Sequence, residues 1–540
     1  MAYLNILRKL TSIILVLFFL FVSIIIFSTW QTYFEQDDEL KALPSSKQES
    51  MKSNTSWPQV QYDANRSGYL SHTVGGPYEV LWRRSMVEEY TSDGLDSLFP
   101  ISHRVQAIVA DSLIFLPSND KSLYALSASD GTTAWSYQTE GGLVNSAGYA
   151  DGKVFFGSTD HYIYALNASD GSLVWRFETG STVKTAPLLV DTKVIMGSSD
   201  GKMYALNQED GTELWSYDIG VPIYDTAAHD NGKVFFGGMD SKVYAVNAED
   251  GAEVWNIQIP AQGFRDRWTV AGHGKVILTP VLLMDHHIPL LNGTDMFKEN
   301  PDYYDVTYNK GWAAQKAVIL DYFDRLPYRQ PVHVIDQETG QVAFTPPIMY
   351  ASGGALSPHC QPVLLPNGNA NIVYRRSFGE PARHGPTTNS ALYTGELDLT
   401  TGDIITVDRC DHDNVFEGDW HDWDVCGTYK SRFISDESTG LMRTGDVIYQ
   451  YASRGAMGLD TANETLIPFS TVIEGTGYEY FDAPVDIFPG EQNYWVVDYD
   501  NIFAELSSDG NDSSRPAAVV GDKFYILNYH TLVVAKGVIR

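Results

Sequence analysis

Side chains capable of chemistry concentrate in one acidic segment, RCDHDNVFEGDWHDWDVCGTYK, which spans residues 409–430 and carries six carboxylates. Calcium takes about six to eight oxygen ligands, so this segment predicts a calcium site with Asp411, Asp413 and Glu417 among its ligands. The spacing of the carboxylates differs from that of an EF-hand loop. The alternative interpretation is a solvated acidic loop that binds no metal ion.

Two groups of aromatic and cationic side chains could hold an organic ligand. The string RDRW contains two arginines that could bind carboxylates by paired hydrogen bonds, next to a tryptophan that could stack on a ring. The alternative for this string is an ion-paired loop around a packed tryptophan. The candidate ligand-binding residues are Arg265, Arg267, Trp268, Trp420, His421 and Trp423.

The cysteine content excludes two classes of cofactor site. Only three cysteines occur, Cys360, Cys410 and Cys426, with no C-x-x-C pair and no C-x-x-C-H string. Zinc ribbons and covalently attached c-type haem are therefore excluded. In an oxidising compartment we expect Cys410 and Cys426 to form a disulfide, which would close a loop of roughly 15 residues and stabilise the fold by about 3 kcal/mol.

An internal repeat defines the elements that must position these residues. Within one unit, KVFFGS, YIYALNA and SLVWRFE are β-rich runs separated by Asp-Gly turns. A sheet formed by one unit of about 40 residues cannot cover both its faces, so the copies are expected to pack around an axis as a β-propeller rather than as a β-solenoid, whose turns are shorter. The copies, evenly spaced along the chain, are ALSASDGTTAW at 125–135, ALNASDGSLVW at 165–175, ALNQEDGTELW at 205–215 and AVNAEDGAEVW at 245–255.

The repeated phrase A-[LV]-[SN]-x-x-D-G-x-x-x-W resembles the tryptophan-docking repeat of pyrrolo-quinoline quinone (PQQ) type propellers over residues 105–260. That family includes quinoprotein alcohol dehydrogenases and a noncatalytic outer-membrane assembly lipoprotein, both described as eight-bladed. The resemblance implies that the repeated tryptophans join neighbouring blades and have no catalytic role. These are Trp82, Trp135, Trp175, Trp215 and Trp255.

Degenerate copies complete an all-β, eight-bladed propeller. Residues 334–344, 396–406 and 445–469 indicate blades five to seven, and residues 516–537 supply only the first three strands of another blade. EVLWRR at 79–84 is expected to provide the missing fourth strand, because this closure leaves no open sheet edge.

Most of the segments that are longer than their counterparts in the regular repeat are expected on one face of the ring. In a propeller, the links from strand four to the next strand one and from strand two to strand three emerge on the same side. Loops mounted on a rigid scaffold commonly carry binding and chemistry. The elaborated segments are 256–268, 345–360, 379–390, 409–430 and an insertion at about 289–329, which includes a predicted helix over 312–326.

The N-terminus predicts a membrane anchor. Residues 10–27 are mostly apolar and would form a helix of roughly 27 Å, long enough to cross a bilayer core. The alternative is a cleaved secretory signal, whose apolar run is usually about 7–15 residues and ends in an A-x-A-like site, a pattern that the following STWQTYF lacks. We therefore expect an anchor over 1–30, a flexible linker over 31–56 and a propeller over 57–540, with the propeller outside the cytoplasm. The net charge of −31 excludes nucleic acid and anionic lipid headgroups as partners of the body.

Two functions fit these observations. The favoured one is a membrane-anchored binding or scaffold propeller that holds a protein, a carbohydrate or a small molecule on its elaborated face. The alternative is a dehydrogenase that oxidises an alcohol or sugar with PQQ and calcium, with Asp422 as the base. The resemblance is incomplete for both, because the chain lacks the adjacent cysteine pair of the dehydrogenases and an N-terminal lipid-bearing cysteine.

The disulfide gives the first testable prediction. Alkylation of the exported protein without reductant should modify Cys360 and leave Cys410 and Cys426 unmodified in mass spectrometry, because only the two bracketing cysteines are expected to be oxidised. With reductant, all three should be modified. Alkylation of Cys410 in the nonreduced sample would show that the pairing is wrong.

Overall fold

The computed structural model describes residues 54–85, 101–102, 104–261, 263–280, 311–348, 361–377, 390–406, 440–452, 455–462, 465–468, 517–528 and 531–539. The chain divides into two compact units, Met1–Ser53 and Asn54–Arg540, and every described residue belongs to the second. Within those ranges, no helix is long and apolar enough to span a membrane. The predicted anchor at 1–30 lies outside them and stays a prediction.

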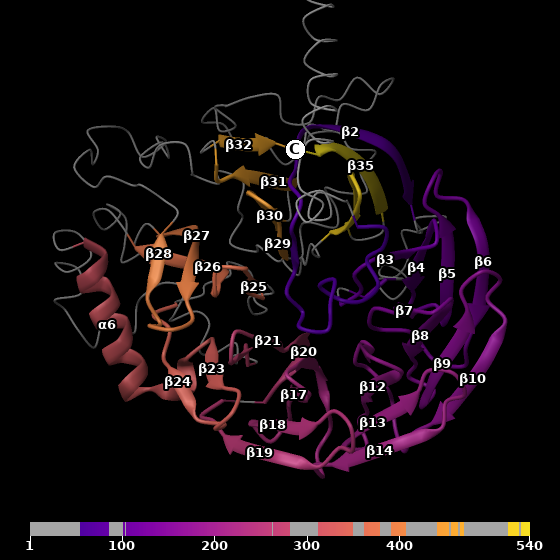
Figure 1. The fold of residues 1–540 in the computed structure, drawn as a ribbon, viewed down its shortest axis with the longest axis horizontal. Helices are drawn as coiled ribbons and strands as arrows, with labels where there is room; N and C mark the ends of the chain where they lie inside the picture. Colours follow the sequence, from indigo (N-terminus) through magenta and orange to yellow (C-terminus); the bar gives the residue numbers. More distant parts are fainter. Residues whose placement is uncertain are drawn as a thin grey trace, which may run out of the picture. The chain divides into compact units, whose positions relative to one another are not determined.

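Four consecutive antiparallel sheets arise from the regular repeats, each with four strands in sequence order. Figure 1 shows them following one another around a ring, with strand one inside and strand four outside. Blade 1 contains β3 (Ile108–Ala110), β4 (Leu113–Pro117), β5 (Ser122–Ser127) and β6 (Thr133–Gln138), and blade 2 contains β7 (Gly148–Ala150), β8 (Lys153–Gly157), β9 (Tyr162–Asn167) and β10 (Leu173–Glu178). Blade 3 contains β11 (Leu188–Val190), β12 (Lys193–Gly197), β13 (Lys202–Asn207) and β14 (Glu213–Asp218), and blade 4 contains β16 (Ala228–Asp230), β17 (Lys233–Gly237), β18 (Lys242–Asn247) and β19 (Glu253–Gln258).

The degenerate copies form blades 5 to 7, as the sequence predicts. Blade 5 contains β21 (Val270–Gly272), β22 (Lys275–Leu278), β23 (His333–Asp336) and β24 (Val342–Phe344), and blade 6 contains β25 (Val363–Leu364), β26 (Asn369–Ser377), β27 (Ser390–Asp398) and β28 (Ile404–Thr406). Blade 7 contains β29 (Gly440–Thr444), β30 (Val447–Ala452), β31 (Gly455–Asp460) and β32 (Thr465–Pro468), with β1 (Tyr69–Leu70) paired in parallel to β29.

Blade 8 joins the two ends of the ring. It contains β33 (Ala518–Val520), β34 (Lys523–Asn528), β35 (Thr531–Ile539) and, as its outer strand, β2 (Val74–Ser85). In the register of β2 and β35, Trp82 lies opposite Val534. The predicted closure is therefore confirmed, and the all-β, eight-bladed fold with it.

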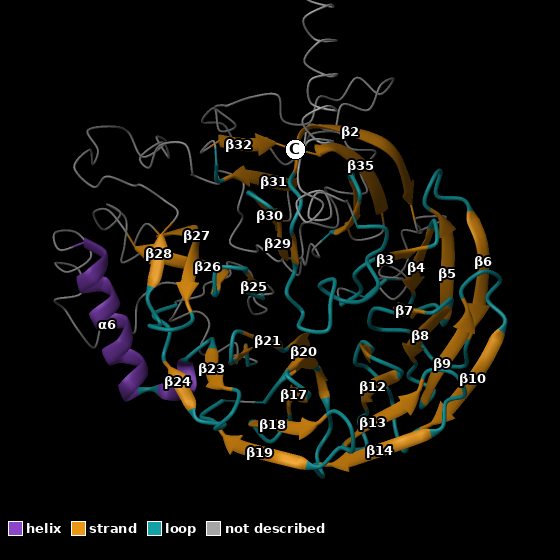
Figure 2. Cartoon of the chain, in the orientation of Figure 1, coloured by secondary structure: helices purple, strands orange, loops and turns teal. Residues whose placement is uncertain are grey.

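The insertion of blade 5 contains α6 (Gly311–Arg325), followed by the 3-10 helix η2 (Pro327–Arg329). Figure 2 shows α6 in purple at the outer side of the ring, near β24 and β28. Lys316 of α6 forms an ion pair with Asp403, which lies in the turn between strands three and four of blade 6. The insertion starts at a link between strands two and three, but its helix lies along the rim rather than over the expected face.

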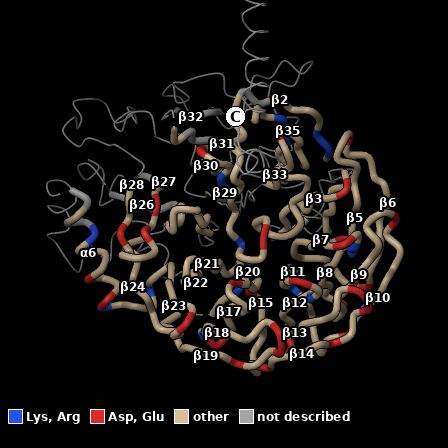
Figure 3. Tube along the Cα trace, viewed as in Figure 1, with Lys and Arg blue, Asp and Glu red and all other residues tan. Residues whose placement is uncertain are grey.

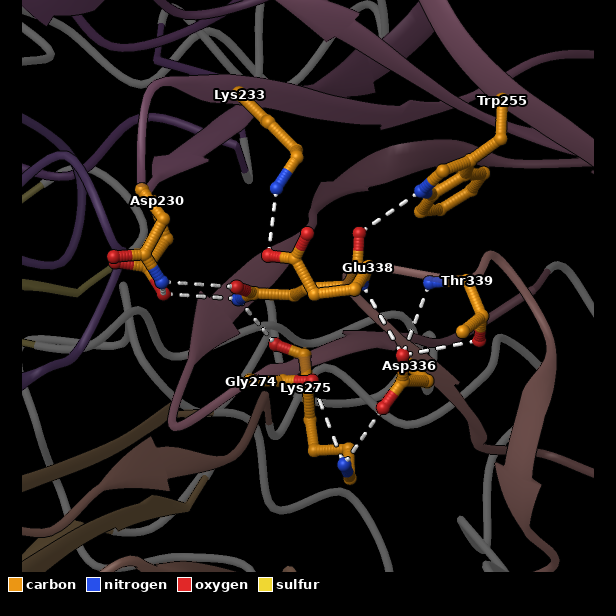
Figure 4. Close-up of polar contacts among 10 residues, drawn as sticks. Asp230, Lys233, Trp255, Gly274, Lys275, Asp336, Glu338 and Thr339 are labelled. Carbon is orange, nitrogen blue, oxygen red and sulfur yellow. Dashed lines mark hydrogen bonds and ion pairs between the residues drawn. The ribbon is translucent and has the colours of Figure 1, made fainter.

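Neighbouring blades are joined by the repeated tryptophans. The indole Nε1–H of Trp175 donates to the carbonyl of Gln208 in the next blade at 3.1 Å, and Trp255 donates to Gln337 at 2.9 Å (Figure 4). Each ring packs on a glycine of the next blade, such as Gly211, whose φ of +73° and lack of a Cβ both favour this contact. The equivalent donors are Trp82, Trp135 and Trp215.

A lysine–glutamate ion pair repeats at three of the same interfaces between blades. A lysine of strand two in one blade contacts a glutamate in the turn before strand four of the next, and Figure 4 shows the pair Lys233 and Glu338. The lysine side chains are only 10–16% exposed, but their glutamate partners are 69–82% exposed, so solvent and salt still screen these pairs. The pairs are Lys153–Glu209 at 2.5 Å, Lys193–Glu249 at 2.7 Å and Lys233–Glu338 at 2.7 Å.

One segment, residues 54–70, runs inside the ring and contacts all eight blades in order. It accepts hydrogen bonds from the backbone N–H of the innermost strand in blades 1 to 7, and Asn54 accepts one from Gly521 in blade 8. We call residues 54–70 the inner segment. The strand-one donors are Val109, Tyr149, Leu189, His229, Ala271, Leu364 and Arg443.

Blades 6 to 8 are joined differently, because Thr406 replaces the docking tryptophan of blade 6. Arg443 of blade 7 donates to Asn371 of blade 6 at 2.9 Å and forms an ion pair with Glu396 at 3.4 Å. Val74, which follows the inner segment, accepts hydrogen bonds from Thr444 and Tyr449 of blade 7 and then enters blade 8. The chain that follows the inner segment, beginning with Val74, therefore helps to join the least regular blades.

The tryptophan contact predicts a difference between two matched glycine variants. An added Cβ at Gly211 would lie 2.6 Å from the Trp175 ring, whereas at Gly232, with the same φ of +73°, it would meet nothing within 4 Å. Gly232→Ala should lower the free energy of unfolding by about 1–2 kcal/mol through backbone strain alone. Gly211→Ala should lower it by about 1–3 kcal/mol more, because the ring must also move. Denaturant unfolding of both variants checks this, and equal losses would contradict the docking role.

Candidate functional site

A buried group of charged residues lies where the inner segment meets blades 3 to 5. Arg66 is fully buried, and its guanidinium is surrounded by acceptors from the protein itself. Burial lowers the pKa of Arg66 to about 9. The acceptors are the carbonyls of Ala227 at 3.1 Å, Val60 at 3.0 Å and Pro187 at 2.9 Å, and the side chain of Gln59 at 3.3 Å.

Asp225 is the buried acid of this group. Its Oδ2 accepts hydrogen bonds from the backbone N–H of Gly237 at 3.0 Å and from the hydroxyl of Thr269 at 2.6 Å. Burial raises the pKa of Asp225 to about 7, although the charges of Arg267 and Arg66 act in the opposite direction. The acid therefore titrates near neutral pH inside the ring.

Asp225 was not singled out from the sequence, although an alignment of the repeats shows a carboxylate there in place of a neutral side chain. It occupies the position that Thr185 holds one repeat earlier and that Asn145 holds two repeats earlier. Thr185 fulfils the same structural role in blade 3, since its hydroxyl accepts a hydrogen bond from the N–H of Gly197 at 3.0 Å. A hydroxyl is sufficient at this place, so the carboxylate is a departure from the repeat.

The RDRW string is a strand rather than a loop. β20 (Arg265–Trp268) pairs in parallel with β15 (Tyr224–Thr226), which precedes blade 4. Arg265 is exposed, whereas Arg267 is only 4% exposed and lies near enough to Asp225 to lower its pKa. The two arginines that we expected to act together therefore lie in different surroundings, and Trp268 is half-buried.

The other predicted site residues lie in 407–439, outside the described residues, so their roles stay predictions. Among the residues that the structure describes, no three or more His, Cys, Asp or Glu side chains are grouped so as to hold a metal ion. The residues of the undescribed segment are Cys410, Asp411, Asp413, Glu417, Trp420, His421, Asp422, Trp423 and Cys426.

Eight blades, with indole-to-carbonyl docking at five of the joints between them, define the class of this protein as a tryptophan-docked β-propeller. Residues 139–276 match the family described as outer membrane protein assembly factor BamB. The PQQ-type repeat seen in the sequence is therefore confirmed over these residues, and the eight four-stranded blades show that the chain is a PQQ-repeat β-propeller.

Solved structures show the same fold at low sequence identity. Quinohemoprotein alcohol dehydrogenase from Comamonas testosteroni has a TM-score of 0.51 and 12% identity, covering 93% of this chain and 83% of its own. BamB from Moraxella catarrhalis has a TM-score of 0.45 and 14% identity, covering 81% of this chain and 97% of its own. No curated protein matches the sequence. The likeness to the Comamonas testosteroni enzyme supports the fold and nothing further.

Asp225 predicts a specific pH dependence. Its folded pKa of about 7 exceeds the unfolded value of about 3.9, so its contribution to stability is full below pH ~4 and is lost as the pH rises through 7. Asp225→Asn cannot ionise, so its free energy of unfolding should rise relative to the native protein, by a few kcal/mol, between pH 4.5 and pH 8. Unfolding midpoints at both pH values measure this difference.

Thr185→Val is the matched control, because it removes the equivalent hydrogen bond without a titrating group. It should lower stability by a similar amount at both pH values. If Asp225→Asn and the native protein instead keep a constant difference across this range, the carboxyl does not titrate near neutral pH.

Proposed function

We propose that this protein is a noncatalytic binding propeller, held at a membrane by its N-terminal helix and acting outside the cytoplasm as a scaffold for a partner. The match to an outer membrane protein assembly factor over residues 139–276 supports both the class and the location. The apolar run at residues 10–27 supports the anchor. The partner is expected on the face where the links before each strand one emerge, which we call the linker face.

The observation that carries this proposal is how the buried charges near the inner segment are used. Arg66 donates to backbone carbonyls of three segments, and the hydrogen-bonding oxygen of Asp225 accepts from Gly237 and Thr269. The bonds of Arg66 connect the inner segment to the chain before blades 3 and 4, and those of Asp225 connect the chain before blade 4 to blade 4 and to the chain before blade 5. The hydrogen-bonding capacity of Arg66 and of this oxygen of Asp225 is thus used within the protein, so we assign both residues a structural role.

The dehydrogenase alternative requires a different set of residues. PQQ is a quinone with several carboxylates, and its chemistry would need accessible cations, calcium ligands and a basic carboxylate. Among the described residues, Arg267 is buried beside an acid that titrates near neutral pH, Arg265 is exposed, and no three or more His, Cys, Asp or Glu side chains are grouped so as to hold a metal ion. The predicted calcium ligands and the predicted base lie outside the described residues, and we derive no step through the cofactor.

One incubation distinguishes the two functions. The full-length protein in detergent, mixed with PQQ and calcium and then desalted, should retain no quinone absorbance and should not oxidise a panel of alcohols and sugars with a dye acceptor. A known quinoprotein dehydrogenase, treated in parallel, is the positive control. A stoichiometric chromophore that is lost in Asp422→Ala would overturn the proposal in favour of the enzyme.

A further inference from the structure

A buried histidine at the start of β23 has a ring nitrogen without a hydrogen-bond partner. His333 is only 1% exposed, and its Nε2 has no partner among the residues that the structure describes. The other ring nitrogen, Nδ1, bonds to the backbone carbonyl of Gln330. The ring is therefore neutral, with its one N–H directed at that carbonyl and a lone pair on Nε2.

The repeat shows that this histidine departs from the pattern of the other blades. Blades 1 to 4 have a tyrosine at the equivalent position, and its hydroxyl donates to the acid four residues earlier at 2.6–2.9 Å. In blade 5 the residue four places before His333 is Arg329, which belongs to the insertion. Blade 5 therefore lacks both the donor and the acceptor of the repeated bond. The four pairs are Tyr124–Asp120, Tyr164–Asp160, Tyr204–Asp200 and Tyr244–Asp240.

The side of the sheet on which His333 lies is apolar. His333 is the register partner of Leu278 and stands two residues before Ile335, so the three side chains share one face of blade 5. Leu278 and Ile335 pack in one cluster with Ile259 and Phe264, from the link between blades 4 and 5. This face therefore offers the ring no acceptor for a second N–H.

Charged groups in the neighbouring elements are paired with one another or exposed. Burial lowers the pKa of His333 to about 4, although the bond to the Gln330 carbonyl acts in the opposite direction. The stability that depends on a neutral ring is therefore full above pH ~6.5 and is lost as the pH falls towards 4. The charged groups are Arg329 with Tyr322, Lys275 with Asp336, Asp240 with Lys242 and Tyr244, Arg325 with Asp321, Lys316 with Asp403, Arg267 near Asp225, and the exposed Asp324 and Arg265.

The end of the blade 5 insertion contacts the histidine ring. Gln330, which is 5% exposed, supplies the carbonyl that Nδ1 contacts, and it directly follows η2. A second proton on the ring would bury a charged N–H without an acceptor, which is unfavourable unless the ring reaches water. Movement of this segment away from blade 5 would hydrate the ring. We call residues 311–330, which comprise α6, η2 and Gln330, the insertion end.

From this geometry we propose that His333 is a pH-sensitive switch, whose protonation under acidic conditions releases the insertion end from blade 5. Release would uncover apolar side chains of α6 that are now 1% exposed. The inference goes beyond the proposed function and does not depend on it, because it concerns a conformational change of the propeller itself. The side chains uncovered are Ile319, Tyr322 and Phe323.

The test is hydrogen exchange of the full-length protein in detergent, at pH 7.5 and pH 5.0. Protection factors correct for the pH dependence of intrinsic exchange, and aspartates in proteins titrate near pH 4, so the measurement stops above that range. In the native protein, peptides from the insertion end should lose protection by at least about tenfold at pH 5.0. Peptides from blades 1 to 4 should keep theirs, because the release is local.

His333→Asn retains an N–H for the Gln330 carbonyl but cannot titrate, so protection of its insertion end should agree within about twofold between the two pH values. His333→Phe, which keeps a ring and also cannot titrate, is the second variant if His333→Asn does not fold. The matched control is His229→Asn, because His229 is half-buried and burial also lowers its pKa. This control should lose protection at the insertion end as the native protein does.

Three results would each overturn the inference. They are unchanged protection of the native insertion end at pH 5.0, a tenfold loss that persists in the His333 variants, and an equal loss throughout blades 1 to 4, which would indicate global destabilisation. None of them bears on the proposed function, which the incubation with PQQ tests separately.

Discussion

The inner edges of the blades set the constraint on which this propeller depends. Each innermost strand has a backbone N–H on the side that faces the axis, and a buried N–H without a partner costs about 1–3 kcal/mol. The inner segment supplies acceptors to the strand-one N–H groups of seven blades and to Gly521 of the eighth. The ring is therefore assembled around an irregular segment, formed mostly of turns and bends, that is not part of the repeat.

The joints between blades depend on two kinds of interaction. Where the repeat is regular, an indole donates to the carbonyl of the next blade and packs on a glycine that has no Cβ, and a lysine–glutamate pair adds a second contact at three interfaces. Where Thr406 replaces the tryptophan, Arg443 and the chain after the inner segment make the contacts instead. Docking tryptophans therefore join the blades with regular repeats, and Arg443 together with the chain after the inner segment joins the blades without them.

The way in which the buried charged side chains are bonded bears on function. Charges that lie against the inner segment are fully bonded within the protein, as Arg66 shows, and they act structurally. Asp and Glu, in red, recur all around the ring (Figure 3), in keeping with the net charge of −31.

The sequence by itself determined the architecture, because the repeat period records local strand and turn preferences that survive in every regular copy. The docking tryptophans, the eight blades and the closing strand at 79–84 were all predictable from it. The polar network was not. Arg66, Asp225 and Thr269 lie far apart in the chain, and only the closure of the ring brings them together in a buried place where desolvation shifts the pKa of the arginine and the acid. Likewise, the two arginines of RDRW differ in exposure although residues two apart in a strand normally share a face. The register of β20 and β15 shifts between Arg265 and Trp268, and this irregularity is a property of the tertiary structure.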